Sequence, residues 1–209
     1  MRIRLCLLIT LACVVATAAC AQEAAEQQPL TPGSEAPEFT ASTLEGVPIS
    51  LSQWEGRVVA LNFFITWYRD AGAHLRMMED LQVSYAEHGM RLLSISLDEG
   101  ERAMNEVGEL VRRHEIAHPV VRDPQQQLAG QYGVRALPAI FIIDQNGKIA
   151  HYHEGFTEGD ELRLSQALAS SLNVEPVQVA PVESATVETQ EDADQPQEPV
   201  CTCFRPADQ

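Results

Sequence analysis

The strongest constraint on the fold is an almost unbroken apolar run at residues 58–65, Val-Val-Ala-Leu-Asn-Phe-Phe-Ile. A run of this length without polar alternation is typical of a strand buried on both faces, and such strands lie in sheets covered by helices. The chain must therefore supply two covering layers. Its 209 residues, 45% of them hydrophobic, suffice for one domain of ordinary size with extensions.

Helical and strand patterns alternate after this run. Apolar residues recur at helical spacing within residues 71–85, 104–111 and 164–172. Further strands are predicted at residues 92–97, 139–143 and 148–153. Asp144–Gly147 supplies a hairpin turn between the last two strands, because Asn-Gly tolerates positive φ. With a short hairpin around Phe39–Ile49 in front, this order predicts an α/β fold, a three-layer α/β/α sandwich with a mixed central sheet.

The N-terminus reads as an export signal over residues 1–21. Arg2 and Arg4 precede an apolar stretch that is too short to span a membrane, and small residues follow it. Two cleavage sites compete. Residues 17–20, Thr-Ala-Ala-Cys, resemble a lipobox, which would leave Cys20 as a lipidated, membrane-anchored first residue, and this interpretation is favoured. Residues 19–21, Ala-Cys-Ala, also fit an ordinary signal-peptidase site. With either cleavage site, we expect the mature protein to be located in the periplasm or cell envelope.

Composition divides the remaining chain into three parts. Residues 22–38, rich in Gln, Glu, Ala and Pro, are interpreted as a tether, and residues 39–173 as the folded domain. Residues 174–209 carry eight acidic residues and one basic residue, so we expect a disordered acidic tail. The net charge of −16 argues against a nucleic-acid partner, since phosphate binding needs a basic surface.

The five cysteines all lie outside the predicted domain. They are Cys6, Cys13, Cys20, Cys201 and Cys203, and residues 21–200 contain none. This distribution excludes a disulfide-stapled core, a cysteine metal cage and a cysteine nucleophile within the domain. Three of the six histidines raise the question of a metal site, because His151 and His153 share one face of a predicted strand and His74 follows the redox-motif position. They lack a third ligand at a telling spacing, so we expect exposed strand histidines, no metal and no cofactor.

Three segments together resemble one known family. The segment at residues 58–67 resembles the strand that leads into the active site of thioredoxin-like proteins, especially the exported TlpA/ResA and redoxin (AhpC/TSA-like) group. Ala36–Phe39, followed by Ile49–Gly56, resembles the entry hairpin of that group. Tyr132–Asp144 resembles the segment that carries the family's cis-proline, here Pro138. The resemblance implies a thioredoxin-like fold over residues 39–173.

The resemblance breaks down at the redox motif. Active relatives carry Cys-x-x-Cys after the tryptophan, at a helix N-terminus that lowers the pKa of the first thiol. Here Trp67 is followed by Tyr68, Arg69, Asp70 and Ala71. A phenol cannot exchange with a disulfide, and alanine offers no resolving thiol. Disulfide and peroxidatic chemistry are therefore excluded at this degenerate site, and whether the protein is an enzyme stays open.

Two functions remain. In the first, the domain is a polypeptide-binding or chaperone-like module for extracytoplasmic chains. Its binding residues would be Trp67, Tyr68, Arg69, Leu137 and Pro138. In the second, Cys201 and Cys203 form a redox pair that works as a cell-envelope thiol–disulfide oxidoreductase. A flexible linker of 27 residues spans roughly 29 Å, enough to bring that pair back to the domain.

Overall fold

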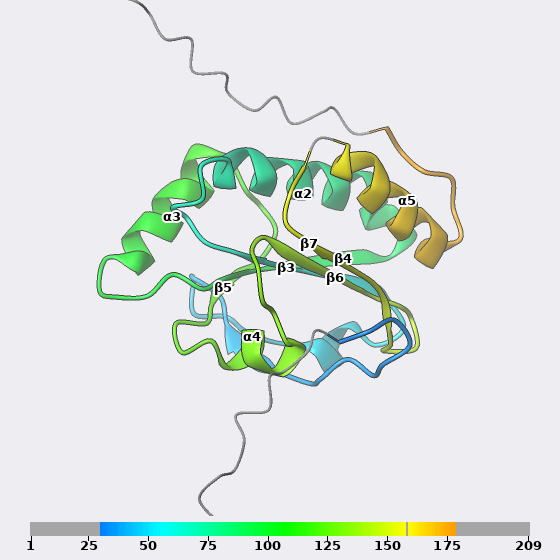
Figure 1. Ribbon diagram of the computed structural model, residues 1–209, viewed down its shortest axis with the longest axis horizontal. Coiled ribbons are helices and arrows are strands. Elements are labelled where there is room, and N and C mark those ends of the chain that lie inside the picture. The colour runs from blue at the N-terminus through cyan, green and yellow to red at the C-terminus, as the bar shows by residue number, and fades with distance from the viewer. Residues whose placement is uncertain (1–29, 158, 179–209) are drawn as a thin grey trace, which may run out of the picture.

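A computed structural model describes residues 30–157 and 159–178 of the chain. These residues form three layers, with a twisted sheet between helices above it and a helix with a small hairpin below it (Figure 1). The predicted three-layer α/β/α sandwich with an N-terminal strand pair is confirmed. Within the described residues, no helix is long and apolar enough to cross a membrane.

The central sheet has five strands in the order β5-β4-β3-β6-β7. Their bounds are β3 Val58–Phe64, β4 Met90–Ser96, β5 Val120–Arg122, β6 Ala139–Ile143 and β7 Ile149–Glu154. Strands β3, β4 and β5 run parallel because a helix connects each to the next. Strand β6 runs antiparallel to both of its neighbours, β3 and β7. The register pairs Phe63 with Ala139, so the end of β3 and the start of β6 meet at one edge of the sheet.

Three helices cover one face of the sheet, and α4 with the hairpin covers the other (Figure 1). The first group is α2 Ala71–Tyr85, α3 Ala103–Arg113 and α5 Asp160–Leu172. The second comprises α4 Gln127–Tyr132, the hairpin strands β1 Thr40–Ser42 and β2 Pro48–Ser50, and the short 3-10 turn η1 Leu51–Trp54. A second 3-10 turn, η2 Ala86–His88, extends α2.

Alternate residues of β3 face opposite layers, and all seven are buried. Val58 and Ala60 pack against α2 and α5, whereas Leu61 and Phe63 pack against α4 and the hairpin. The apolar run at 58–65 therefore fills two separate cores at once, which explains why its sequence shows no polar alternation.

Two short elements were not predicted. The strand β5 has three residues and α4 has six, too few for a period of 2 or 3.6 residues to be visible. The Asp123 side chain accepts hydrogen bonds from two backbone N–H groups at the start of α4, at 2.9 Å each. This capping accounts for a helix that apolar spacing does not reveal.

At both ends, residues beyond the predicted bounds 39–173 contact the domain. Within residues 30–38, Gly33 and Ala36 donate backbone hydrogen bonds to the β6–β7 hairpin and Ala36 packs on the core. At the other end, the Val177 N–H donates to the Tyr85 hydroxyl at 2.8 Å, and the Ser165 hydroxyl donates to the Val177 carbonyl. Residues 174–178 are thus part of the domain. The rest of the expected tail lies outside the described residues.

Candidate functional site

Residues 67–71, which the resemblance places at the redox motif, lie where β3 ends and α2 begins, beside the start of β6. Around this junction seven side chains close a small, mainly apolar hollow, and these belong to Phe64, Ile65, Tyr68, Ala71, His74, Leu137 and Pro138. The space between them is too small to hold a water molecule. The structure therefore brings together four of the predicted site residues, Tyr68, Ala71, Leu137 and Pro138.

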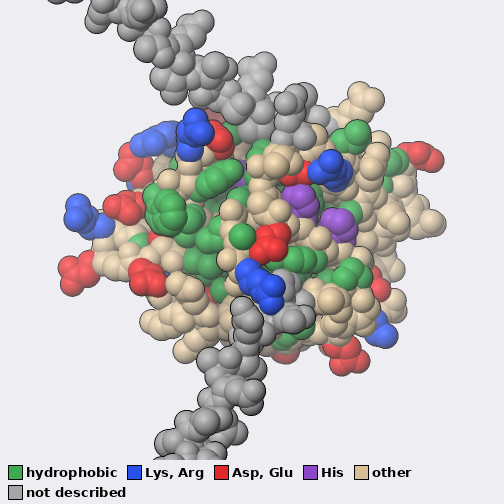
Figure 2. Space-filling view, in the orientation of Figure 1, with side chains coloured by type: hydrophobic (Ala, Val, Ile, Leu, Met, Phe, Trp, Pro, Cys, Tyr) green, Lys and Arg blue, Asp and Glu red, His purple; other side chains and the backbone are tan. Residues whose placement is uncertain are grey.

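The predicted residues differ widely in exposure. Trp67 is 79% exposed and Arg69 is also exposed, so both project from the loop instead of lining the hollow. Tyr68 and Leu137 are half-buried and pack on the core, whereas Ala71 is buried. Figure 2 shows hydrophobic side chains gathered over these loops, with charged side chains around them. This is an apolar surface patch with a polar rim.

The peptide bond between Leu137 and Pro138 is cis, as the family resemblance implied. The Pro138 carbonyl accepts a hydrogen bond from the Gly155 N–H at 2.8 Å, which ties the start of β6 to the end of β7. Among the described residues, no hydrogen bond involves the main chain of Arg135, Ala136 or Leu137. These polar backbone groups are free to pair with another chain.

Asp98 holds the motif loop in place. This buried carboxylate follows β4, and it accepts hydrogen bonds from the Thr66 N–H at 3.0 Å and the Thr66 hydroxyl at 2.7 Å. The Ser96 hydroxyl donates to it as well, at 2.8 Å. Because Thr66 directly precedes Trp67, this carboxylate determines where the exposed indole leaves the domain. By contrast, the Asp70 side chain makes no capping hydrogen bond, although it occupies the N-cap of α2.

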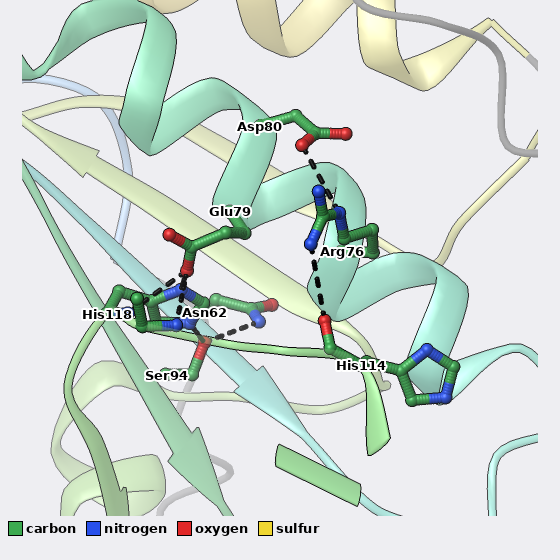
Figure 3. A network of polar contacts seen from close by, with 8 residues as sticks. Asn62, Arg76, Glu79, Asp80, Ser94, His114 and His118 are labelled. Carbon is green, nitrogen blue, oxygen red and sulfur yellow. Dashed lines mark hydrogen bonds and ion pairs between the residues drawn. The ribbon is translucent and has the colours of Figure 1, made fainter. Parts of the chain in front are cut away.

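Beneath the hollow, a chain of polar side chains crosses the core between α2 and the sheet. His74 Nε2 lies 2.7 Å from Asn62 Oδ1, and Asn62 Nδ2 lies 3.1 Å from Ser94 Oγ. Ser94 Oγ lies 2.8 Å from His118 Nε2, and His118 Nδ1 lies 2.6 Å from Glu79 Oε2. Figure 3 shows this path from Asn62 through Ser94 and His118 to Glu79. All five side chains are buried.

The Glu79 carboxylate and the Asn62 amide nitrogen determine the donor directions along this chain. An ionised carboxylate only accepts, so His118 Nδ1–H donates to Glu79, and an amide nitrogen only donates, so Asn62 Nδ2–H donates to Ser94 Oγ. The Ser94 hydroxyl then donates to Nε2 of neutral His118, and Asn62 Oδ1 accepts from His74 Nε2–H. The carboxylate is kept ionised because the His118 hydrogen bond lowers the pKa of Glu79 to about 2. The result is a neutral His74 whose Nδ1 carries a lone pair.

His74 Nδ1 has no hydrogen-bond partner among the described residues, although the side chain is 1% exposed. Its ring packs edge-to-face against Phe156, with the centroids 5.1 Å apart. Burial lowers the pKa of His74 to about 3, so the ring stays neutral at physiological pH. His74 thus carries one unpaired lone pair in the buried layer between α2 and the sheet.

Sequence reasoning missed this network. A signal was present, because Asn62 and Ser94 are polar residues in the middle of otherwise apolar strands. The contact between them depends on the strand register, because the pairing of β3 with β4 places Asn62 directly opposite Ser94. The partners His118 and Glu79 come from a loop and from α2, and no local spacing connects them.

The remaining predicted site residues do not join this surface. His151 and His153 stack on β7 with centroids 6.5 Å apart and are half-buried, not exposed as expected. Among the described residues, no group of three or more His, Cys, Asp or Glu could hold a metal ion. Cys20, Cys201 and Cys203 lie outside the described residues, so lipidation and the tail pair stay predictions.

Residues 32–152, which are 121 of the 209, match the model of the AhpC/TSA family. The chain belongs to the AhpC/TSA family. The thiol-disulfide oxidoreductase ResA of Geobacillus thermodenitrificans is 33% identical over 138 residues, 66% of this chain and 78% of the relative. ResA of Bacillus thuringiensis strain Al Hakam is 34% identical over 125 residues, 60% of this chain and 70% of the relative.

Solved structures agree with this assignment. A crystal structure described as a thiol:disulfide interchange protein DsbE from Chlorobium tepidum superimposes with a TM-score of 0.64 and 29% identity, covering 68% of this chain and 99% of that one. The resemblance to the thioredoxin-like TlpA/ResA and redoxin group is thereby confirmed. The chain is a thioredoxin-like member of a thiol–disulfide oxidoreductase family, and its residues 21–200 contain no cysteine.

Replacing Asp98 with alanine should destabilise the domain by about 2–4 kcal/mol, because buried donors of Thr66 and Ser96 lose a charged acceptor. Urea unfolding followed by tryptophan fluorescence measures the loss. Glu99→Ala is the matched control, since Glu99 is an exposed neighbouring carboxylate that accepts a hydrogen bond from Gln126, and its loss should shift stability by less than about 0.5 kcal/mol. Equal losses in both variants would contradict the anchoring role of Asp98.

Acid should destabilise the domain partly through His74. Its pKa is about 3 in the folded state and about 6.5 in the unfolded chain, so between these values only the unfolded state binds the proton. Stability therefore falls as pH drops below 6.5, by up to about 1.4 kcal/mol per pH unit. Glu79, with a folded pKa of about 2, adds its loss only as pH falls through 4.5.

Between pH 6.5 and 5 the contribution of His74 to the pH dependence can be measured separately from that of Glu79. There His74→Gln should flatten the stability profile by close to one proton near pH 5, as measured by urea unfolding at each pH. The control is His88→Gln, which changes an exposed histidine outside the network. An unchanged slope in His74→Gln would show that this ring is not buried in its neutral form.

Proposed function

We propose that this protein binds extended segments of extracytoplasmic polypeptides at the Trp67 surface, defined as Trp67, Tyr68, Arg69, Leu137 and Pro138. The observation that carries the proposal is the exposure of Trp67, which is 79% accessible beside half-buried Tyr68 and Leu137. Large aromatic side chains are seldom so exposed unless they meet a partner, and tryptophan is enriched among residues that dominate binding energy. A chaperone-like role follows if many sequences are accepted.

The backbone next to this surface supports recognition of an extended chain. The free main-chain groups of residues 135–137 offer hydrogen bonds that any polypeptide can make, whatever its side chains. Trp67 and Leu137 then supply apolar contacts for alternate side chains of the bound segment. Binding of this kind requires no thiol, which fits a domain without cysteines.

Disulfide exchange at this surface would need a thiolate at position 68 and a resolving thiol at position 71. Tyr68 and Ala71 provide neither, and the family assignment alone does not restore the chemistry. We therefore propose that the domain keeps the polypeptide-binding part of the family's architecture and lacks redox activity at the usual site.

The proposal includes export to the periplasm or cell envelope. Its support is the basic pair and apolar stretch within residues 1–21, together with a cysteine-free domain in a thiol–disulfide oxidoreductase family. If cleavage leaves Cys20 as the first residue, its lipid would hold the domain at a bilayer. The Trp67 surface would then meet polypeptides close to the membrane.

Capture of an unfolded, reduced and alkylated protein should depend on the Trp67 surface. The double variant Trp67→Ser with Leu137→Ser should weaken binding about tenfold or more, because it removes both apolar contacts. The matched control is Val83→Ser with Leu162→Ser, which removes two exposed apolar side chains, 68% and 51% accessible, from α2 and α5. Fluorescence anisotropy gives both affinities, and equal weakening would eliminate this surface as the binding site.

A second function is thiol–disulfide exchange by Cys201 and Cys203. It is favoured because these two cysteines form a closely spaced thiol pair, which the domain itself lacks. Insulin reduction by the mature chain, compared with a truncation at Val200, tests it. We expect equal, background turnover from both. Turnover that disappears on truncation would instead establish the tail as the redox group. Tyr68→Cys with Ala71→Cys serves as the positive control, since thiols at the start of α2 should gain activity.

A further inference from the structure

A cleft lies at the end of the sheet opposite the Trp67 surface. Val59 pairs with Ile143 near the start of β3, whereas Trp67 follows the end of that strand, roughly 20 Å further along. Val59 and Ile143 line the cleft together with Leu51 and Trp54, and its volume is about 390 Å³. The Trp54 side chain is half-buried and packs on the core, so it forms an aromatic wall. We call this place the Trp54 cleft.

The charged side chains of the cleft favour a cation. Glu38, Glu55 and Asp144 line it against the single guanidinium of Arg57, so its net formal charge is −2. Glu38 and Asp144 each accept a backbone N–H, whereas the exposed Glu55 carboxylate has no hydrogen bond or ion pair within the described residues. An occupant that joins an apolar group to one positive charge therefore complements both the walls and the charges.

The C-terminal segment of the chain contains one such combination. Within residues 174–209, Phe204 is the sole aromatic residue and Arg205 the sole basic one, and the other charged residues are eight acidic ones. The carboxylates of the cleft therefore attract this segment at one position and repel it elsewhere. Charge complementarity selects Phe204 and Arg205 as the part that fits the Trp54 cleft.

The C-terminal segment leaves the described domain at the same end of the sheet as the cleft. The Tyr85 hydroxyl, at the end of α2, accepts from the Val177 N–H at 2.8 Å. Strand β4 begins five residues after Tyr85, and its first residue pairs with the first residue of β3. The cleft is on the other face of the sheet, so the path around its end is about 20 Å, two layer spacings.

The length of the chain covers this path. Phe204 follows the last described residue, Gln178, by 26 positions. An unstructured chain of that length has an r.m.s. span of roughly 28 Å, from about 5.5 Å times √26. The distance therefore presents no obstacle to a contact within one molecule.

We propose that Phe204 and Arg205 dock in the Trp54 cleft of their own chain, with the phenyl ring against the indole and the guanidinium among the carboxylates. Docking holds the tail's two cysteines within three residues of the cleft, and hence away from the Trp67 surface. No bond is made or broken. The inference is independent of polypeptide binding at the Trp67 surface, and it gives a physical reason to expect no thiol–disulfide exchange there.

A weak contact is sufficient for this docking. Exposed ion pairs contribute little free energy, so most of the affinity comes from burying the phenyl ring against the indole. A linker of this kind gives an effective concentration of about 1 mM, so a segment with a millimolar Kd is docked about half of the time. One aromatic residue beside one charge meets that requirement.

The indole N–H signals of Trp54 and Trp67 in ¹H–¹⁵N spectra test the docking. The chain from residue 21 to 209 is compared, under reducing conditions, with its truncation at Val200. The Trp54 signal should differ between the two, because only the longer chain contains the docking residues, and the Trp67 signal should coincide.

Two pairs of substitutions in the longer chain show which residues cause the difference. Phe204→Ser with Arg205→Ser should return the Trp54 signal to its position in the truncated chain. The matched control is Val182→Ser with Glu183→Ser, which changes one apolar and one charged residue elsewhere in the same segment and should have no effect.

A peptide tests the cleft without the linker. Acetyl-Thr-Ser-Phe-Arg-Pro-Ala-amide reproduces residues 202–207 with serine in place of Cys203. Added to the truncated chain, it should move the Trp54 signal with a Kd of about 1 mM. Glu55→Lys should weaken this binding about fivefold because it reverses a charge in the lining, whereas Glu45→Lys, exposed between β1 and β2, should not.

Three results would overturn the inference. The first is a Trp54 signal that is identical in the longer and the truncated chain. The second is a Trp54 difference that grows with protein concentration, because the segment then binds a second copy. The third is a difference at Trp67 in place of Trp54, which would put the tail at the Trp67 surface. None of them concerns capture of an unfolded protein, so failure of this docking and failure of the proposed function are distinguishable.

Discussion

The position of α2 on the sheet depends on a hydrogen-bonded chain buried inside an otherwise apolar layer. Hydrophobic packing of Leu75, Met78 and Leu81 would hold this helix against β3 and β4, yet apolar contacts alone tolerate small slides and rotations. The polar chain does not, because His74 bonds to Asn62 on β3 and Glu79 accepts hydrogen bonds from Ala117 and His118 in the loop before β5. Fixing those two points fixes the helix axis, and with it the first turn, where Tyr68 and Ala71 approach Leu137 and Pro138.

This constraint explains how the site can hold its shape with no thiol at positions 68 and 71. In a thiol–disulfide oxidoreductase the start of this helix must be placed precisely, because the two sulfur atoms act there together. Here the placement comes from Asp98, which holds Thr66, and from the buried chain, and neither involves positions 68 or 71. The architecture of the site therefore does not require thiols at these two positions. A domain without them can present Trp67 and a free backbone segment to a partner.

Much of the fold could be predicted from residue patterns because those patterns reflect burial. The run at 58–65, the helical spacing over 71–85 and the Asn-Gly turn each report local structure, and all three were correct. The site was predictable only in outline. Which residues line the hollow depends on the antiparallel pairing of β6 with β3, and the link from Asn62 to His118 spans 56 residues through Ser94. Single-sequence patterns carry no information on such long-range contacts, and short elements such as β5 and α4 fall below the length at which periodicity is visible.

Trp67 and the buried polar chain contribute to the site in different ways. Trp67 is exposed to water in the free domain, so burying it against a partner would contribute favourable free energy whatever the partner's sequence. His74, Asn62 and Glu79 are dehydrated and hydrogen-bonded when the domain folds, so they determine the position of α2 and add no contact area. An exposed apolar side chain and a precisely placed backbone can therefore coexist in one surface, since different residues provide them.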